Sequence, residues 1–311
     1  MRSVLRVAGV AVAVLLIGGC SLGSSQLGAA AFVDGTEIPL DQVHSQLVTV
    51  LDKEGPRARA ELTAGHQLDD VSRKILTVQI RHRLLEIAAR RAGLTVDQAR
   101  VQRLINEVGG AEAASKGTIF DANGYRERAK DKVLMAQLGR VALRDSAVTV
   151  DYTTADTRTA AKRRVEELAQ AGSTQAGQLI EADVRAGKDA ELGKRIVAAD
   201  DPIFATTPAF GVAEGTVVAF QLNDTKPWVI MVITSRTSRG VHASDHAPPI
   251  DQIDPAVLEA VGLRQLARVG EDGGVRLNPR YGVWDPVNVQ VVGDDNETGG
   301  FVAPLRAAPR A

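Results

Sequence analysis

The sequence has few of the residues that carry redox, metal or nucleophilic chemistry. Cysteine occurs once in 311 residues and histidine five times. A single cysteine excludes a disulfide within the chain. The closest histidines, His242 and His246, lie in a proline-bearing connector without a ligand cluster, so we interpret them as solvated loop residues. The acidic stretch 293–300 lacks the ligand spacing of a calcium loop. We therefore expect no metal site.

Aromatic residues make up only 4% of the chain, and neither sign of charge dominates. With so few aromatics, the core must consist mostly of Leu, Val, Ile and Ala, a composition that favours helices. The 37 Lys and Arg residues balance 38 Asp and Glu residues, which leaves no basic excess for a nucleic-acid partner. The sequence also lacks a Gly-x-Ser-x-Gly elbow, a phosphate-binding loop and a dinucleotide-binding glycine pattern. We therefore expect no nucleotide and no other cofactor.

An uncharged run over residues 7–19 follows two basic residues, Arg2 and Arg6. A bilayer span needs about 20 apolar residues, so this run is too short for one, and it is typical of the hydrophobic region of a secretory signal peptide. Small residues at its end allow a peptidase to hold an extended backbone in its active site. Directly before Cys20 the run ends in an aliphatic residue and two small ones, which are Ile17, Gly18 and Gly19.

This stretch resembles the bacterial lipobox. The resemblance implies that residues 1–19 are a signal peptide, that the sulfur of Cys20 receives a diacylglycerol, and that cleavage leaves Cys20 at the mature N-terminus. Residues 20–30, rich in small and polar side chains, are then a tether. Two or more acyl chains hold a protein stably on a bilayer, so we expect a lipid-anchored protein on the extracytoplasmic face of the cell membrane. The alternative is a signal anchor in which the cysteine is incidental.

Hydrophobic periodicity predicts a helical domain over residues 31–146, after a short strand and a turn at Asp34–Gly35. The stretch 55–66 has no clear period and is predicted to be a loop. Four helices around one apolar centre are the simplest arrangement of this domain. Their amphipathic patterns follow Pro39, cover 68–91, follow the capping-box pair Thr95 and Gln98, and cover 125–144.

At residue 147 the pattern changes to that of a small α+β module, over 147–239. Alternation in "AVTVDYTT" predicts a strand, a helix follows it, and "EGTVVAFQL" and "PWVIMVITS" are typical of strands. Asp254 and Pro255 form an N-cap and first-turn pair, which opens a helix that returns to the first domain. Residues 250–290 are interpreted as this helix and a closing segment, and 291–311 as a disordered tail. The expected fold class is mainly α with a small α+β insert.

The opening "FVDGTEIPLDQV" and the helix "ILTVQIRHRLLEIAARRAGLTVDQARV" resemble the N-terminal domain of SurA-type periplasmic chaperones and of PrsA-like foldase lipoproteins. The segment "RLNPRYGVWDP" is similar to the closing segment of actinobacterial lipoproteins of this kind. The resemblance covers residues 31–144 and 254–286. It implies a SurA-like helical chaperone domain that the C-terminal helix completes, often with a parvulin-type prolyl isomerase domain inserted between the two parts.

Residues 209–238 are similar in shape to the end of a parvulin domain, with a Phe-Gly turn and a closing strand. Parvulins carry histidines in the first and closing strands, beside a cysteine or aspartate. Here no histidine lies between His82 and His242, and the closing strand begins Pro227-Trp228-Val229-Ile230. Asp151 aligns only loosely with the first-strand histidine. The resemblance therefore predicts a degenerate parvulin-like module that has lost its catalysis.

These observations favour an ATP-independent chaperone or foldase-like protein that binds unfolded, newly exported polypeptides through apolar helical faces. Two alternatives stay open: a parvulin-type peptidyl-prolyl isomerase with unfamiliar residues, and a non-catalytic scaffold for one envelope partner. Candidate client contacts are Phe120, Tyr125 and Met135. A further cluster is interpreted as structural, with its two rings closing the helical core and its arginine holding a carboxylate or carbonyl: Asn278, Pro279, Arg280, Tyr281 and Trp284.

Replacing Cys20 by serine tests the lipobox directly. We expect Cys20→Ser to move the protein from the membrane fraction to the soluble fraction, because the sulfur that receives the lipid is lost. Fractionation of cells that express either form measures this. Membrane association that is unchanged in the variant would refute the lipobox and favour the signal anchor.

Overall fold

The computed structural model describes residues 28–65 and 67–307; Cys20 and the three lipobox residues lie outside this range. The helices are α1 (Leu40–Ala64), α2 (Leu68–Arg91), α3 (Gln98–Glu107), α4 (Ala111–Ser115), α5 (Ala122–Asp145), α6 (Arg158–Arg185) and α7 (Pro255–Gly273). The strands are β1 (Ala29–Val33), β2 (Thr36–Pro39), β3 (Ala147–Ala155), β4 (Glu191–Val197), β5 (Thr216–Gln221), β6 (Trp228–Thr237), β7 (Val275–Leu277), β8 (Val283–Asp285), β9 (Gln290–Val292) and β10 (Gly300–Pro304). Single 3-10 turns are formed by Phe204–Thr206, Pro208–Phe210, Ile250–Gln252, Pro279–Tyr281 and Asp295–Glu297.

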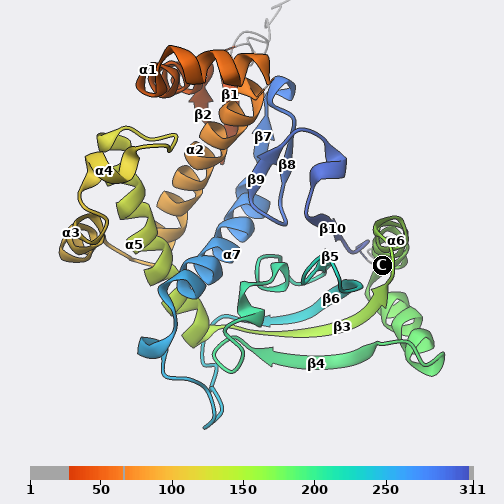
Figure 1. Ribbon diagram of the computed structural model, residues 1–311. Helices are drawn as coiled ribbons and strands as arrows, with labels where there is room; N and C mark the ends of the chain where they lie inside the picture. The colour runs from red at the N-terminus through yellow and green to blue at the C-terminus, as the bar shows by residue number, and fades with distance from the viewer. Residues whose placement is uncertain (1–27, 66, 308–311) are drawn as a thin grey trace, which may run out of the picture.

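The fold has a helical part and a sheet part that lie side by side (Figure 1). Helices α1 to α5 and α7 form the first part, and a five-stranded sheet with α6 forms the second. Helix α5 leads directly into β3, and α7 brings the chain back from the sheet to the helices. The fold is therefore mainly helical with a substantial β part, in agreement with the expected class.

The chain opens with a tight hairpin to which it later returns. The turn between β1 and β2 places Asp34 at φ 49° and Gly35 at φ 73°, as a two-residue hairpin turn with both central residues at positive φ requires. Strand β7 pairs with the other side of β1, in the order β2-β1-β7. The Asn278 Nδ2 then donates to the Ala29 carbonyl at 3.0 Å. The closing segment is thus fastened to the first strand.

Residues 55–64, predicted to be part of a loop, continue α1 after a kink. Gly55 has φ 84°, a left-handed conformation that interrupts the helix and that glycine tolerates. Pro56 follows it and suits the first turn of the second helical segment. The prediction was wrong because this second segment is largely exposed and therefore has no apolar stripe to detect.

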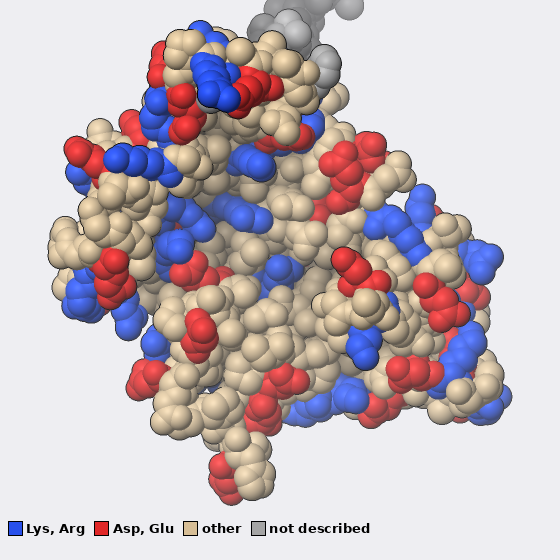
Figure 2. Space-filling view, viewed as in Figure 1, with Lys and Arg blue, Asp and Glu red and all other residues tan. Residues whose placement is uncertain are grey.

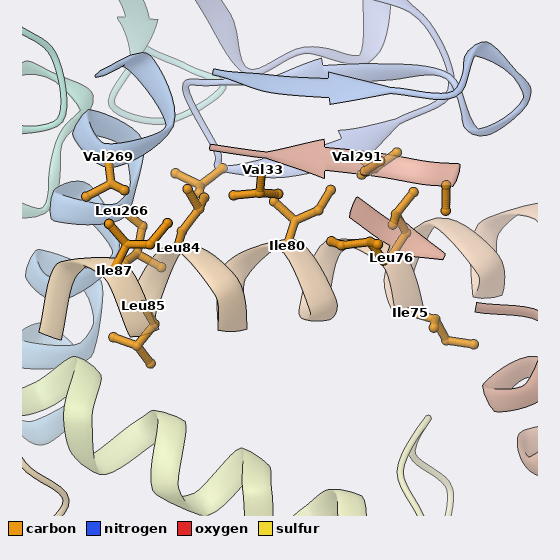
Figure 3. Close-up of a cluster of buried hydrophobic side chains, with 14 of the residues drawn as sticks. Val33, Ile75, Leu76, Ile80, Leu84, Leu85, Ile87, Leu266, Val269 and Val291 are labelled. Atoms are coloured by element: carbon orange, nitrogen blue, oxygen red, sulfur yellow. The ribbon is translucent and has the colours of Figure 1, made fainter. Parts of the chain in front are cut away.

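Helix α2 lies at the centre of the apolar core of the helical part (Figure 3). Its residues Leu76, Ile80 and Leu84 are fully buried and point toward the side of β1, β9 and α7, where Val33 lies. Leu85, also buried, points to the opposite side, toward α5. Because α2 buries side chains on two sides, its apolar stripe is wider than that of a surface helix, which explains why it gave the clearest helical pattern in the sequence.

Helix α7 begins after the Asp254 cap, as the sequence indicated, and packs along α5 through two glycines. A Cβ added at Gly139 would lie 1.9 Å from the Leu258 carbonyl oxygen, and one added at Gly262 would lie 2.1 Å from the Met135 carbonyl oxygen. Both distances are far below van der Waals contact. The two backbones therefore approach more closely than any side chain at these positions would permit.

The five-stranded sheet is antiparallel throughout, in the order β10-β5-β6-β3-β4. Helix α6 covers one face, where Leu168 and Ile180 pack against Ile230. The opposite face shares a second apolar cluster with α7, in which Val218 packs with Leu258. The sheet is thus a two-sided layer between α6 and the returning helix.

Residues 291–307, predicted to be part of a disordered tail, are ordered and complete the fold. Strand β10 pairs with β5 along its whole length, and the ring of Phe301 lies 5.7 Å from that of Trp228. After β10, the Arg306 N–H donates to the Ala169 carbonyl of α6 at 2.7 Å. The prediction was wrong because it used local composition, whereas the partners of β10 lie far earlier in the chain. The module therefore extends beyond 147–239; residues 308–311 lie outside the described range.

Candidate functional site

One face of the molecule is hollowed beside α1, α2 and α5, and Lys and Arg side chains reach into the hollow (Figure 2). A cleft of about 410 Å³ lies between these helices, and we name it the helical cleft. Lys53 of α1 fastens the segment that carries Phe120 to the cleft, since its Nζ donates to the carbonyls of Ser115 and Phe120 at 3.0 and 2.8 Å. The lining is mostly polar and charged: Glu37, Gln42, Gln46, Gln79, His82, Arg83, Glu86, Glu127, Arg128 and Asp131, with Ile38, Val78, Phe120 and Gly124.

An imidazole–carboxylate pair joins α2 and α5 in this cleft. His82 Nδ1 lies 2.9 Å from one Asp131 carboxylate oxygen, and the Asp131 side chain is only 9% exposed. The hydrogen bond to Asp131 raises the pKa of His82 above its ordinary value of 6.5, partial burial opposes this, and the charges of Asp131, Glu86 and Glu127 add to the increase. The imidazole of His82 therefore stays protonated to a higher pH than that of a free histidine.

Two arginines hold the turn between β8 and β9, residues 285–289, from the side of the helices. Arg81 of α2 donates to the carbonyls of Asn288 and Val289 at 3.0 and 2.8 Å. Arg264 of α7 donates to the Val287 carbonyl. Three successive carbonyls are thus bound by guanidinium groups, which fixes the turn that leads toward β10.

The buried charges of this turn are incompletely balanced. Asp285 is fully buried, but its carboxylate accepts from the backbone N–H groups of Val287, Asn288 and Gly299 rather than from a guanidinium. Burial lowers the pKa of Arg81 to about 10, helped by repulsion from nearby arginines, and burial alone lowers the pKa of Arg264 to about 10 against the attraction of Asp285. Both arginines therefore stay charged at neutral pH.

Val289, in the same turn, adopts a backbone conformation that its side chain disfavours. Its φ is 55°, in the left-handed region, where β-branched residues are outliers. Such a conformation costs about 1–3 kcal/mol and persists only when the surroundings over-determine it. Here the surroundings are Arg81 on its carbonyl and complete burial of its side chain.

A second cavity, of about 440 Å³, opens where this turn meets the sheet, and we name it the module cavity. Its apolar walls come from the two 3-10 turns at 204–210, from β5 and from the 285–289 turn. Asn288, whose carbonyl binds Arg81, also lines it, so the helical part and the module cavity adjoin at this turn. The apolar residues of the lining are Ile203, Phe204, Pro208, Phe220, Leu222 and Val287.

The rim of the module cavity carries the two most exposed large apolar side chains among the described residues. Ile203 is 67% exposed and Leu222 is 55% exposed, whereas the next, Val108, is 43% exposed. Scattered single apolar residues are normal on a protein surface, but apolar side chains grouped around one concavity are typical of binding sites. This grouping makes the module cavity the strongest candidate for a binding site.

The polar groups that line the module cavity are Asp201, Thr206, Thr207, Gln221, Arg264 and Asn288. Asp151, considered for the place of a parvulin histidine, lies on the other face of the sheet. Its Oδ1 accepts from the Gly193 N–H at 2.7 Å, and its Oδ2 lies beside Gly177 of α6. Asp151 therefore cannot act on a molecule in the module cavity.

The three candidate client contacts differ in their surroundings. Phe120 is half-buried and lines the helical cleft. Tyr125 is half-buried and packs against the small core formed by α3, α4 and α5. Met135 is only 6% exposed and belongs to the central core at the α5–α7 crossing. The proposal of Met135 as a client contact was wrong, because the close approach of α7 buries it.

The cluster interpreted as structural closes the helical core, with one correction. Tyr281 is buried in that core and Trp284 packs against it half-buried, while Asn278 binds β1 and Pro279 opens a 3-10 turn. Arg280 was expected to hold a carboxylate or carbonyl. Among the described residues its guanidinium instead lies over the Tyr281 ring, 5.5 Å from the centroid, because it is exposed beside that ring.

Sequence reasoning missed the residues that form the module cavity. Ile203 and Leu222 look like ordinary loop residues in the sequence, and Arg264 looks like part of the polar face of an amphipathic helix. A signal was available for the first two, since each is a large apolar residue beside Pro, Asp or Asn in a turn. No local signal marks Arg264, since its burial depends on the 285–289 turn.

No known protein-family model matches the chain, and no curated protein is significantly similar to it. The resemblance to SurA-type and PrsA-like proteins therefore stays a prediction. Within residues 28–65 and 67–307, no helix combines the length and apolar character needed to cross a bilayer. In the same range, no three His, Cys, Asp or Glu side chains come together as ligands for a metal.

The His82–Asp131 pair predicts a pH-dependent contribution to stability. Because the pKa of His82 is higher in the folded protein, this contribution is complete below about pH 6.5 and is lost as the pH rises through the folded-state pKa. We expect the urea midpoint of the wild type to exceed that of His82→Gln at pH 5.5–6 by more than at pH 8. The exposed His44 provides the control, and a His82→Gln difference that is constant with pH would contradict the pairing.

Proposed function

We propose that this protein is a lipid-anchored, extracytoplasmic chaperone or foldase-like protein that binds unfolded, newly exported polypeptides without covalent chemistry. The proposed binding site is the module cavity, with the helical cleft as a second contact surface. The proposal rests above all on one observation: Ile203 and Leu222, the most exposed large apolar side chains of the described residues, rim the same cavity. Unfolded chains offer apolar side chains that such a rim can cover.

The helical cleft supports the same proposal in a different way. Its lining of glutamines and charged residues suits the backbone and polar side chains of an extended polypeptide better than it suits apolar ones. The helical cleft is therefore proposed as a second contact surface for a client whose apolar residues occupy the module cavity. This differs from the expectation of apolar helical faces, since the two most exposed large apolar side chains of the described residues lie on the module.

The chemistry of the cavity favours binding over isomerisation. Rotation about an X-Pro bond meets a barrier of about 18–20 kcal/mol, and an enzyme lowers it with polar groups placed around the twisted amide. The titratable residues of the lining are Asp201 and Arg264, and Asp201 is committed to capping the turn at Phe204, whose N–H lies 2.9 Å away. Of its titratable side chains, the cavity thus leaves only the guanidinium of Arg264 for a bound polypeptide.

Removing the apolar rim tests the proposal. We expect the purified protein to suppress the aggregation of several unrelated, chemically unfolded clients. The double variant Ile203→Ser, Leu222→Ser should suppress it several-fold less, because each serine removes about 1.5–3 kcal/mol of apolar contact if the side chain is fully buried by a client. Light scattering after dilution of the client from denaturant measures the effect.

A matched control uses two apolar residues exposed elsewhere, Val184 and Leu192, which are 42% and 41% exposed. The variant Val184→Ser, Leu192→Ser should keep full activity. Equal activity of both double variants would remove the module cavity from the proposal. Suppression confined to one partner would favour the scaffold, and acceleration of X-Pro isomerisation in a peptide assay would favour the enzyme.

A further inference from the structure

The module cavity contains a buried guanidinium that the protein uses only in part. Arg264 is 8% exposed and lines the cavity. Its Nη1 donates to the Val287 carbonyl, while its Nε is buried without a hydrogen-bond partner. Among the described residues, no carboxylate forms an ion pair with it. Buried charges in proteins are normally paired, because an unpaired one costs several kcal/mol.

A second donor in the same lining is also unused. Thr207 is 8% exposed, and its Oγ1 is buried without a hydrogen-bond partner among the described residues. Buried polar groups are satisfied in the large majority of cases. What distinguishes this cavity is that two such groups lie in one lining, where a ligand with acceptor oxygens would satisfy both.

The neighbouring charged residues that the structure describes do not use the remaining hydrogen-bond donors of Arg264. The charge of Asp285 acts on Arg264, but the carboxylate oxygens of Asp285 accept from three backbone N–H groups instead. Arg81 adds a second positive charge close enough to repel Arg264. Asp201 also lines the cavity, but it is exposed, so solvent and salt screen its charge. The electrostatic potential around Arg264 in the cavity is therefore positive.

We propose that the module cavity recognises a carboxylate next to an apolar side chain on a polypeptide, with Arg264 as the carboxylate-binding residue. The carboxylate accepts from the free guanidinium nitrogens of Arg264 and from Thr207, and the neighbouring side chain packs between Phe204, Phe220 and Leu222. A guanidinium matches the planar geometry of a carboxylate. This inference rests on the proposed binding of polypeptides and names the group that the cavity selects.

Two sources supply this chemistry: the C-terminal carboxylate of a chain that ends in an apolar residue, and an internal Asp or Glu beside one. Three short fluorescein-labelled peptides distinguish them by fluorescence anisotropy with the full protein. The first ends in leucine with a free carboxylate, the second is its C-terminal amide, and the third is an amide with an internal Glu-Leu pair.

We expect the free acid to bind at least about tenfold more tightly than its amide, since a hydrogen bond to a charged group contributes about this much. Tight binding of the third peptide as well would assign recognition to internal acidic residues too. If neither carboxylate-bearing peptide binds better than the plain amide, the inference is wrong. This comparison uses the wild type, so it holds even where a variant does not fold.

Variants then assign the preference to one residue. Arg264→Met should remove the difference between acid and amide while leaving the binding of the amide. Arg236→Met is the matched control, because Arg236 is also a buried guanidinium, binding the carbonyls of Phe210 and Val212, and does not line the cavity. A preference that survives Arg264→Met would overturn the assignment. If the acid and the amide bind equally, the inference is wrong, but the protein should still suppress aggregation. The inference can therefore fail while the proposed function stands.

Discussion

The close contact of α5 and α7 through Gly139 and Gly262 is the constraint on which the rest of the structure depends. Helices α5 and α7 both contribute side chains to the helical core and to the apolar cluster of the sheet, so their contact joins the two parts of the fold. The distance between α7 and α5 is set by the close approach of their backbones at these two glycines. Arg264 follows Gly262 by two residues, so the same close approach determines where Arg264 meets the 285–289 turn.

Arg81 and Arg264 link the packing of the helices to the 285–289 turn, which forms part of the wall of the module cavity. Arg81 and Arg264 bind three successive carbonyls, and this holds Val289 in a conformation that a valine otherwise avoids. From there the chain runs through β9 and a 3-10 turn into β10, the edge strand that pairs with β5. The walls of the module cavity thus come from segments far apart in the sequence, and buried polar contacts as well as apolar packing hold the 285–289 turn in place.

The elements with strong local signals were predictable from the sequence. The α2 stripe, the Asp34–Gly35 turn and the Asp254–Pro255 helix start are local patterns, and each appears where it was expected. The second half of α1 and strand β10 were missed because exposure hides a helical period in one and a distant partner creates the other. The same reason explains the site: the burial of Met135 and Arg264 depends on how α7 packs, and no pattern within either helix encodes that.

The most direct measurement is the free energy of unfolding of Gly262→Ala compared with that of Gly177→Ala. At Gly177 of α6 an added Cβ meets only one atom, at 3.8 Å, so alanine should leave stability unchanged or raise it by up to about 1 kcal/mol. At Gly262 the Cβ would meet the α5 backbone, and we expect a loss of about 1–3 kcal/mol together with faster amide exchange in the 285–289 turn. Equal stability of the two variants, with unchanged exchange at the turn, would contradict the account.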